Sequence, residues 1–246
     1  MVRGIYSSAS GMQYLLLKQE VTANNLANVN TTGFKRQGVF RRTLTDVERL
    51  AQQHTTDFVN LEEVDDTRTV HTAGAFATTN NPLDIAIDGP AFLTVDSPNG
   101  PRYTRNGSLT VGNDGVLQTS HGYPVSGLAG PVQIIGDEVF IADDGQVFVD
   151  GVLQDQLQLA TFAEPWQLTR EGDGLYNAGD AIPTTSLFPE SRIRQGVLED
   201  SNVEALDEMV AMIATNRGFE AGQRALTMQD ETLRRTVNDV GRVRAQ

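Results

Sequence analysis

Apolar and small polar side chains recur every seven residues near the start of the chain, a pattern typical of a helix that packs along one seam. Ile5, Met12 and Leu26 occupy one position of this repeat, and a second series follows three positions later. The repeat stops at residues 30–33, Asn-Thr-Thr-Gly, and glycine readily supplies the left-handed conformation that follows many helices. The pattern therefore predicts an N-terminal helix that ends near this glycine.

A second seven-residue repeat follows in the last fifty residues. Met212, Phe219 and Leu226 mark successive heptads, which continue at positions 233 and 240. Ser201 and Glu204 have the spacing of a capping box, in which the Ser hydroxyl and the Glu carboxylate satisfy backbone N–H groups at a helix start. We therefore predict a long C-terminal helix with Ser201 as its N-cap.

The sequence leaves two questions about these helices open. Gly218 and Gly222 lie inside the second helix, where each costs roughly 1 kcal/mol relative to Ala, and either a close helix contact or a hinge explains them. The narrow apolar seams of the two helices pack either on each other or on other subunits, because a helix with one apolar stripe needs a partner to be stable in water.

Short alternating runs separated by turn residues predict β-structure between the helices. Residues 83–87 and 91–95 read as strands, and the Asp-Gly pair at 150–151 joins the runs 147–149 and 152–153 as a hairpin. Strands with turns every ten residues or so are typical of an antiparallel sheet or sandwich.

The predicted fold is α+β, with coiled-coil-type N- and C-terminal helices that form one unit and an antiparallel β-domain inserted between them. The chain is predicted to divide into four segments: an N-terminal assembly helix over 1–42, an extended connection over 43–81, a β-rich domain over 82–195 and a C-terminal assembly helix over 196–246. The two chain ends must meet in this layout.

The composition excludes several classes of protein. The formal net charge is −13, which argues against nucleic-acid binding, and the acidic residues are concentrated in 46–195, with 22 of the 32. The chain has no cysteine, so it has no disulfide, thiolate ligand or thiol nucleophile. The longest aliphatic run is the three leucines at 15–17, which predicts no membrane insertion. Residues 1–14 lack the apolar run of a cleavable signal peptide.

No motif indicates catalysis, a metal or a cofactor. The candidate carboxylates lie mostly in turns, where Asp is expected for backbone reasons. Residues 143–145, Asp-Asp-Gly, lack the ligand spacing of a calcium loop, and 172–174, Gly-Asp-Gly, lack the third glycine of a nucleotide loop. A small basic cluster, which includes Lys35 and Arg36, reads either as a solvated face or as a surface for an acidic neighbouring subunit.

Several stretches resemble signatures of the bacterial flagellar rod and hook protein family. Residues 23–36, Ala-Asn-Asn-Leu-Ala-Asn-Val-Asn-Thr-Thr-Gly-Phe-Lys-Arg, are similar to its N-terminal signature, and residues 195–203 to its C-terminal one. Residues 81–89 and 103–107 resemble the start of its β-domain. The sequence departs from many relatives at 89–93, where a second glycine and two Phe residues are expected.

This resemblance implies a structural subunit of the flagellar basal-body rod that assembles helically through its terminal helices and transmits torque. The implied partners are copies of itself, other rod and hook proteins, and the type III export apparatus, which would export the chain without a cleavable signal. Residues 3–12 are more similar to the proximal-rod type than to the distal-rod or hook-type alternative.

The same resemblance implies an assembly interface at both ends of the chain. Its apolar members would pack the seam, and Asn24, Asn28, Arg217 and Glu220 would fix the register. The full predicted set is Asn24, Asn25, Leu26, Asn28, Gly33, Phe34, Asn202, Met212, Ile213, Arg217, Phe219, Glu220 and Leu226.

Two other classes compete with this interpretation. One is a secreted module whose acidic β-domain binds a carbohydrate or peptide, although Trp166 is the sole tryptophan. The other is a hydrolase that uses carboxylates.

Overall fold

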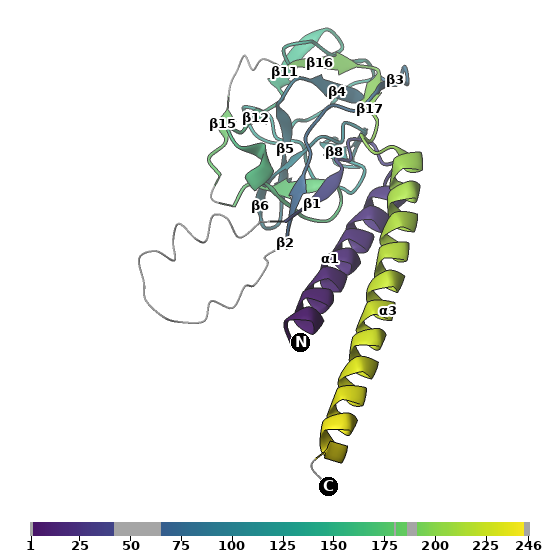
Figure 1. Ribbon diagram of the computed structural model, residues 1–246. Helices are drawn as coiled ribbons and strands as arrows, with labels where there is room; N and C mark the ends of the chain where they lie inside the picture. Colours follow the sequence, from purple (N-terminus) through teal and green to yellow (C-terminus); the bar gives the residue numbers. More distant parts are fainter. Residues whose placement is uncertain (1, 42–64, 180, 186–190, 244–246) are drawn as a thin grey trace. The chain divides into compact units, whose positions relative to one another are not determined.

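The computed structural model describes residues 2–41, 65–179, 181–185 and 191–243 (Figure 1). The chain divides into two compact units. The first comprises Met1–Leu26, Gln37–Arg68 and Ala205–Gln246, and holds both terminal helices. The second comprises Ala27–Arg36 and Thr69–Glu204, and holds most of the strands.

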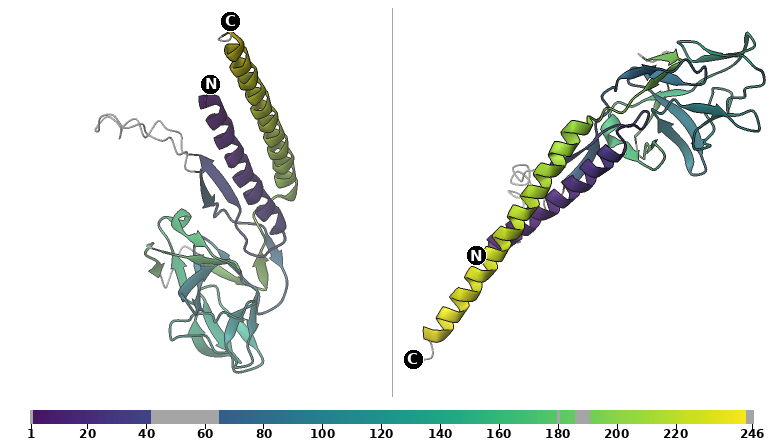
Figure 2. Two further views of the ribbon diagram at one scale, coloured as in Figure 1. Left: turned by 90° about the horizontal axis from the view of Figure 1, so that it is seen from below. Right: turned by 90° about the vertical axis from the view of Figure 1, so that its right-hand side faces the viewer.

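Two long helices form most of the first unit, as the heptad patterns predict. Helix α1 spans Val2–Ala27 and helix α3 spans Ala205–Val243. They lie side by side in opposite directions, and α3 extends past the start of α1 (Figure 2). This difference follows from their lengths, 26 and 39 residues, at about 1.5 Å of rise per residue.

The predicted start of the second helix is wrong by three residues, because an N-cap at Ser201 would make residue 202 the first helical residue and α3 begins at Ala205. The Ser201 hydroxyl accepts a hydrogen bond from the Val203 N–H at 3.3 Å, in a turn that precedes α3. This is a local side-chain-to-backbone turn of the kind that competes with helix capping at Ser residues. Residues Val197–Glu199, just before it, form a strand.

A small two-stranded sheet completes the first unit. Strand β1, Gln37–Arg41, pairs with β2, Asp65–Thr69. The Arg68 guanidinium lies 5.7 Å from the centre of the Phe40 ring. The sequence pattern assigns residues 37–41 to the N-terminal helical segment and residues 65–69 to an extended connection, so it predicts neither strand. Neither segment alternates apolar and polar residues clearly.

The second unit is a set of antiparallel sheets, as predicted. The largest sheet among the described residues has the strand order β13-β14-β6-β5-β12-β15, and β16 and β17 pair with β4 and β3. The elements are β3 Phe76–Thr78, β4 Ile85–Asp88, β5 Phe92–Ser97, β6 Gly100–Thr104, β7 Leu109–Val111, β8 Leu117–Thr119, β9 Val139–Ile141, β10 Gln146–Val149, β11 Val152–Gln156, β12 Leu159–Thr161, the short 3₁₀ helix η2 Pro165–Gln167, β13 Thr169–Arg170, β14 Leu175–Asn177, β15 Thr184–Thr185, β16 Arg192–Gln195 and β17 Val197–Glu199.

The hairpin predicted around residues 150–151 is confirmed. Strands β10 and β11 pair in antiparallel register, with Val149 opposite Val152. Asp150 and Gly151 between them have φ angles of 50° and 78°. Positive φ at both central residues suits a two-residue turn that follows the twist of the strands.

Alternation along β5 divides the core between the two faces of the large sheet. Leu93 and Val95 belong to an aliphatic cluster that extends through the rest of the second unit. Phe92, one position away, belongs to an aromatic cluster with Tyr103 and Tyr176. Because successive strand residues point to opposite faces, the sheet has an aliphatic face and an aromatic face.

Candidate assembly site

The N-terminal signature leaves α1 through a turn that requires glycine. Gly33 adopts a φ of 67°, as predicted, but it lies six residues beyond the last residue of α1. Its N–H donates to the Glu199 carbonyl at 2.7 Å. A Cβ placed on Gly33 would lie 2.5 Å from the Arg105 carbonyl carbon, so a side chain is excluded by space as well as by conformation.

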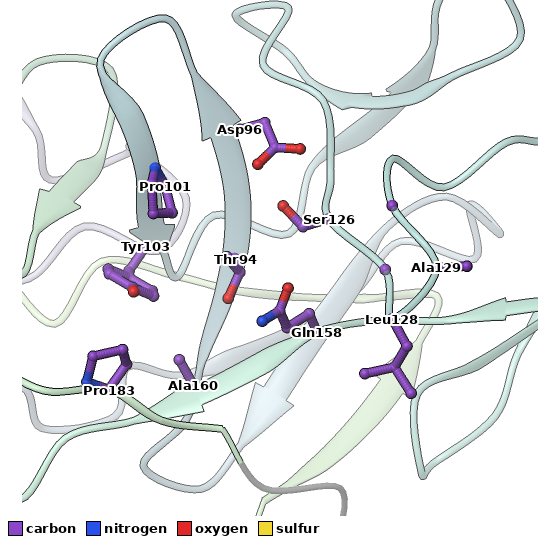
Figure 3. Close-up of a pocket in the computed structure, with 12 residues that line it drawn as sticks. Thr94, Asp96, Pro101, Tyr103, Ser126, Leu128, Ala129, Gln158, Ala160 and Pro183 are labelled. Carbon is purple, nitrogen blue, oxygen red and sulfur yellow. The ribbon is translucent and has the colours of Figure 1, made fainter.

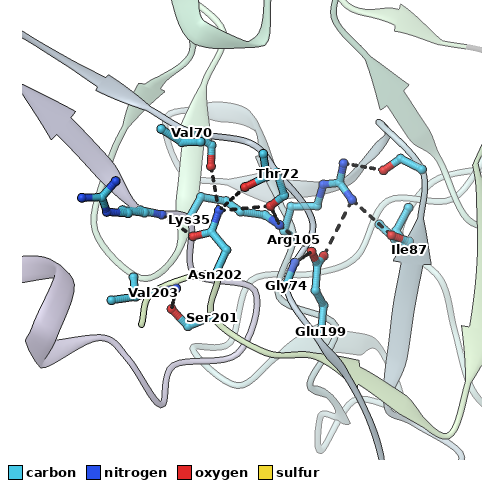
Figure 4. Close-up of polar contacts among 12 residues, drawn as sticks. Lys35, Val70, Thr72, Gly74, Ile87, Arg105, Glu199, Ser201, Asn202 and Val203 are labelled. Atoms are coloured by element: carbon cyan, nitrogen blue, oxygen red, sulfur yellow. Dashed lines mark hydrogen bonds and ion pairs between the residues drawn. The ribbon is translucent and has the colours of Figure 1, made fainter. Parts of the chain in front are cut away.

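A buried ion pair joins the N-terminal signature to the C-terminal one (Figure 4). Lys35 Nζ lies 2.5 Å from Glu199 Oε1, and both side chains are almost completely buried. The same ammonium donates to the Thr72 carbonyl at 2.8 Å, and Glu199 Oε1 also accepts from the Gly74 N–H at 2.9 Å. Lys35 therefore lies neither on a solvated face nor on a neighbour-binding surface, the two alternatives that its charge suggested.

Arg105 brings a second cation to the same carboxylate. Its Nη1 lies 3.7 Å from Glu199 Oε2 and donates to the Ile87 carbonyl at 3.1 Å. Its guanidinium also lies 4.8 Å from the centre of the Phe92 ring. Two cations thus face one buried carboxylate, and burial lowers the pKa of Lys35, against the opposing influence of Glu199.

Asn202 ties three separate segments together with its amide (Figure 4). Its Oδ1 accepts from the Arg36 N–H at 2.6 Å, and its Nδ2 donates to the carbonyls of Val70 and Thr72 at 2.9 and 3.1 Å. An amide has both donors and acceptors. The Asn202 side chain therefore bridges the backbone of the N-terminal signature and the backbone of residues 70–72.

Phe34 is buried beside this network. The Arg170 guanidinium lies 3.8 Å from the centre of its ring, which is the geometry of a cation–π contact. Gly33, Phe34 and Asn202, all predicted assembly residues, are therefore engaged within the second unit of one chain.

Within the first unit, Asn25 has a comparable role. Its Nδ2 donates to the Gln37 carbonyl, and its Oδ1 accepts from the Gln37 N–H, each at 2.9 Å. The buried side chain thereby pairs with one backbone residue in the way that a neighbouring strand would.

Gly218 and Gly222 mark the contact between the two helices. A Cβ on Gly218 would lie 3.3 Å from a Leu15 methyl carbon, and a Cβ on Gly222 would lie 3.0 Å from Met12 Cγ. The helix runs unbroken through both glycines. Close packing therefore explains them, and the hinge alternative is unnecessary.

Helix α3 has a second apolar face that points away from α1. At about 100° per residue, Met212, Phe219 and Leu226 share the face of Gly222. The opposite side carries a stripe of exposed apolar residues, which we call the α3 outer stripe: Leu206, Met209, Val210 and Ile213, with exposed fractions of 72%, 48%, 58% and 55%.

The predicted assembly residues therefore fall into three groups by exposure. Arg217 and Glu220 continue the α3 outer stripe, and Glu220 pairs with Arg224 at 3.4 Å on the same helix. The exposed residues are Asn24, Ile213, Arg217 and Glu220; the half-buried ones are Leu26, Asn28, Asn202, Met212, Phe219 and Leu226; the buried ones are Asn25, Gly33 and Phe34.

Sequence reasoning missed the carboxylate and the second cation of the buried network. Glu199 and Arg105 stand inside the two motifs that resemble the family, but neither motif indicates that their side chains are buried. Leu198 gave no signal for this burial, because successive residues of a strand point to opposite faces and Leu198 is only half-buried beside the buried Glu199. In the part of the chain that the structure describes, no group of three His, Asp or Glu side chains has the arrangement of a metal site, and no helix is long and apolar enough to span a membrane.

Family models match three parts of the chain in order. The model for the flagella basal body rod protein matches residues 5–35, that for the flagellar hook protein FlgE/F/G D1 domain matches 86–149, and that for the flagellar basal body rod FlgEFG protein C-terminal matches 194–239. The first match includes Lys35 and the third includes Glu199, the two residues of the buried ion pair.

Individual relatives are similar along almost the whole chain. The chain is 33% identical to the flagellar basal-body rod protein FlgG of Bacillus subtilis over 261 residues, which cover 97% of this chain and 99% of that protein. It is 31% identical to FlgF of Rhizobium meliloti, with 98% and 99% covered, and 32% identical to FlgF of Salmonella typhimurium, with 94% and 95% covered. The chain belongs to the flagellar basal-body rod protein family, and it is a structural subunit of the rod.

Proposed function

We propose that this subunit assembles helically with copies of itself and with other axial proteins through its terminal helices, and that the α3 outer stripe is a principal contact surface. In this proposal residues 1–42 and 196–246 carry assembly, 82–195 form the β-domain, and 43–81 connect them. The helices would become coiled-coil-like seams when subunits stack, and the many small contacts would transmit torque.

The observation that carries the proposal is the exposure of the α3 outer stripe. Leu206, Met209, Val210 and Ile213 follow one another at helical spacing, so they form one continuous apolar face. Intrachain packing on α1 uses the opposite side of the helix, through Gly222 and its neighbours. A contiguous apolar face left exposed on a subunit is typical of a protein–protein contact.

The polar residues that continue the α3 outer stripe suit a role in fixing the register between neighbouring subunits. Arg217 and Glu220 are exposed, and the Glu220–Arg224 pair is solvated, so either charge can exchange partners at small cost. On α1, Ala23 and Ala27 are exposed one turn apart. Small residues at that spacing allow another helix to come close, and Asn24 lies beside them.

Substitution of an apolar residue in the α3 outer stripe by a charged one tests the proposal. We expect Ile213→Asp, expressed in cells that lack the wild-type subunit, to abolish swimming and the recovery of complete rods in isolated basal bodies. The purified variant should keep the wild-type unfolding midpoint, because the side chain is exposed in the free chain. Ala225→Asp, at an exposed position of α3 outside the stripe, is the matched control and should assemble. Normal rods with Ile213→Asp would contradict the proposal.

We further propose a proximal position in the rod, on the resemblance of residues 3–12, and export through the flagellar type III apparatus without a cleavable signal. Relatives named FlgF and FlgG match with similar identity, so the whole-chain similarity does not decide the position. Crosslinking in isolated basal bodies separates the two positions: the subunit should crosslink to components at the base of the rod and not to hook subunits. The reverse result would favour the distal or hook-type alternative.

A further inference from the structure

A polar cavity opens on the aromatic face of the large sheet (Figure 3). Its volume is about 560 Å³, within the usual range of about 300–1,000 Å³ for ligand pockets. Thr94 and Asp96 are alternate residues of β5, and Gln158 and Ala160 belong to the neighbouring segment. Side chains two residues apart share one face of a strand, so the fold gathers these groups on one wall.

Two buried hydroxyls in this cavity have no hydrogen-bond partner among the described residues. Thr94 is 3% exposed and Ser126 is 5% exposed, and the Oγ atom of each is unpaired. A buried polar group without a partner costs about 1–3 kcal/mol, and such a group usually pairs with an ordered water or a ligand. Figure 3 shows the side chains of Asp96, Ser126 and Gln158 gathered along the same side of β5 as Thr94.

The backbone beneath these side chains is already paired. The Thr94 N–H donates to the Gln158 carbonyl at 3.0 Å, the Ser126 N–H to the Thr94 carbonyl at 3.0 Å, and the Gln158 N–H to the Ser126 carbonyl at 2.9 Å. A peptide that binds by adding a strand needs free backbone groups at a sheet edge. The hydrogen-bonding capacity of this cavity lies instead in hydroxyl, amide and carboxylate side chains.

We propose that this cavity binds a neutral carbohydrate. A sugar hydroxyl is both donor and acceptor, so it can pair with the Thr94 and Ser126 hydroxyls, which are themselves both. The Gln158 amide can serve sugar hydroxyl or acetamido groups in the same way, and the Asp96 carboxylate accepts hydrogen bonds from hydroxyls. That carboxylate, in a chain with a net charge of −13, repels anionic ligands.

The apolar part of the lining suits the same ligand. Leu128, about half exposed, and the rings of Pro101 and Pro183 line the cavity beside the polar groups. A sugar ring presents apolar C–H surface as well as hydroxyls, so it can cover these side chains while its hydroxyls satisfy the buried oxygens.

Titration of the ¹⁵N-labelled full chain with defined tetrasaccharides tests the proposal. The probes are the β-1,4-linked tetramers of glucose and of N-acetylglucosamine, with tetragalacturonate as the anionic comparison. We expect at least one neutral tetramer to bind with millimolar affinity or better and to shift the amide resonances of residues 126–130. Tetragalacturonate should not shift them. Absence of binding by both neutral tetramers, or shifts that lie outside the cavity, would overturn the proposal.

Variants separate a binding role from a structural one. Because their hydroxyls are unpaired, Thr94→Val and Ser126→Ala should weaken sugar binding by about tenfold without lowering the unfolding midpoint. Thr104→Val is the matched control: this buried hydroxyl donates to the Gly174 carbonyl at 3.0 Å, so the variant should be less stable and bind sugar normally. Unchanged binding by both cavity variants, or a lower midpoint for them, would overturn the proposal. Rod assembly does not depend on this result.

Discussion

Lys35 Nζ and Glu199 Oε1 lie 2.5 Å apart although 164 positions separate the residues in the chain. Lys35 lies near the end of the N-terminal signature, and Glu199 lies in the C-terminal signature. Their contact therefore brings the first and last segments of the second unit together. The two signatures that identify the family therefore also join the first and last segments of the unit that contains the β-domain.

Removing the carboxylate should destabilise this unit strongly. Glu199→Gln leaves Lys35 and Arg105 buried without a counter-charge, which typically costs about 3–5 kcal/mol. Urea unfolding followed by circular dichroism measures the loss. Asp114→Asn, in an exposed turn, is the control and should change stability little.

A double variant shows whether this loss of stability comes from the Lys35–Glu199 ion pair. Lys35→Met combined with Glu199→Gln should be less destabilised than the sum of the two single variants, because the first change removes one of the cations that the second leaves unpaired. Additive effects would show that the two side chains contribute independently.

His71 makes the stability of the same unit depend on pH. Its ring packs edge-on against Phe92 and Tyr176, with centroids 5.4 Å apart in each case. Burial, together with the charges of Arg105 and Lys35, lowers the His71 pKa from 6.5 to about 4. Between these values the unfolded chain binds more protons than the folded one, so stability falls as pH falls from 6.5 to 4.

The expected contribution of His71 over this range is roughly 3 kcal/mol. His71→Phe should unfold in urea with a shallower loss of stability between pH 6.5 and 4, since it removes the group that takes up the proton. Identical pH slopes for the wild type and the variant would show that carboxylates account for the whole dependence.

Gly33→Ala should be costly for two independent reasons. The residue has a φ of 67°, and a Cβ would meet the backbone of Arg105 at 2.5 Å. We expect a loss of more than about 2 kcal/mol in thermal or urea unfolding. Gly11→Ala, in α1, adds a methyl group that would meet no atom within 4 Å, so it should instead stabilise the helix by up to about 1 kcal/mol.

Disturbing the helix contact at Gly222 should affect helix α1 alone rather than the stability of the second unit. Gly222→Leu should separate α3 from Met12, so the amide protons of α1 should exchange faster with solvent, as hydrogen-exchange mass spectrometry would show. Ala221→Leu, at the adjacent exposed position, should leave exchange unchanged. Equal exchange in the two variants would mean that α1 does not depend on this contact.

The elements with strong local signals were predicted well from the sequence. Heptad spacing identified both helices, and the Asp150-Gly151 pair identified its hairpin, because in each case a short-range pattern determines the conformation. The start of α3 was misplaced since Ser201 uses its hydroxyl in a turn before the helix. The strand pair β1–β2 was missed because it joins segments far apart in the chain.

The sequence singled out residues of the candidate site through the resemblance, but it did not predict the contacts that they make within one chain. The resemblance pointed to Gly33, Phe34 and Asn202, and all three lie at the junction of the two signatures. Their contacts within one chain could not be predicted, because Asn202 pairs with residues 70 and 72 and Phe34 with Arg170, at separations that no local pattern encodes. Periodicity also could not separate Met212, which faces α1, from Ile213, which faces outward.

The most direct test of the account measures whether the α3 outer stripe is covered in the rod. The native chain has no cysteine, so Ile213→Cys provides a single thiol for labelling with a maleimide. The free subunit should label rapidly, basal bodies carrying the variant should be protected, and dissociation of the rods should restore labelling. Equal labelling in the free subunit and in intact rods would contradict the assignment of this face to assembly.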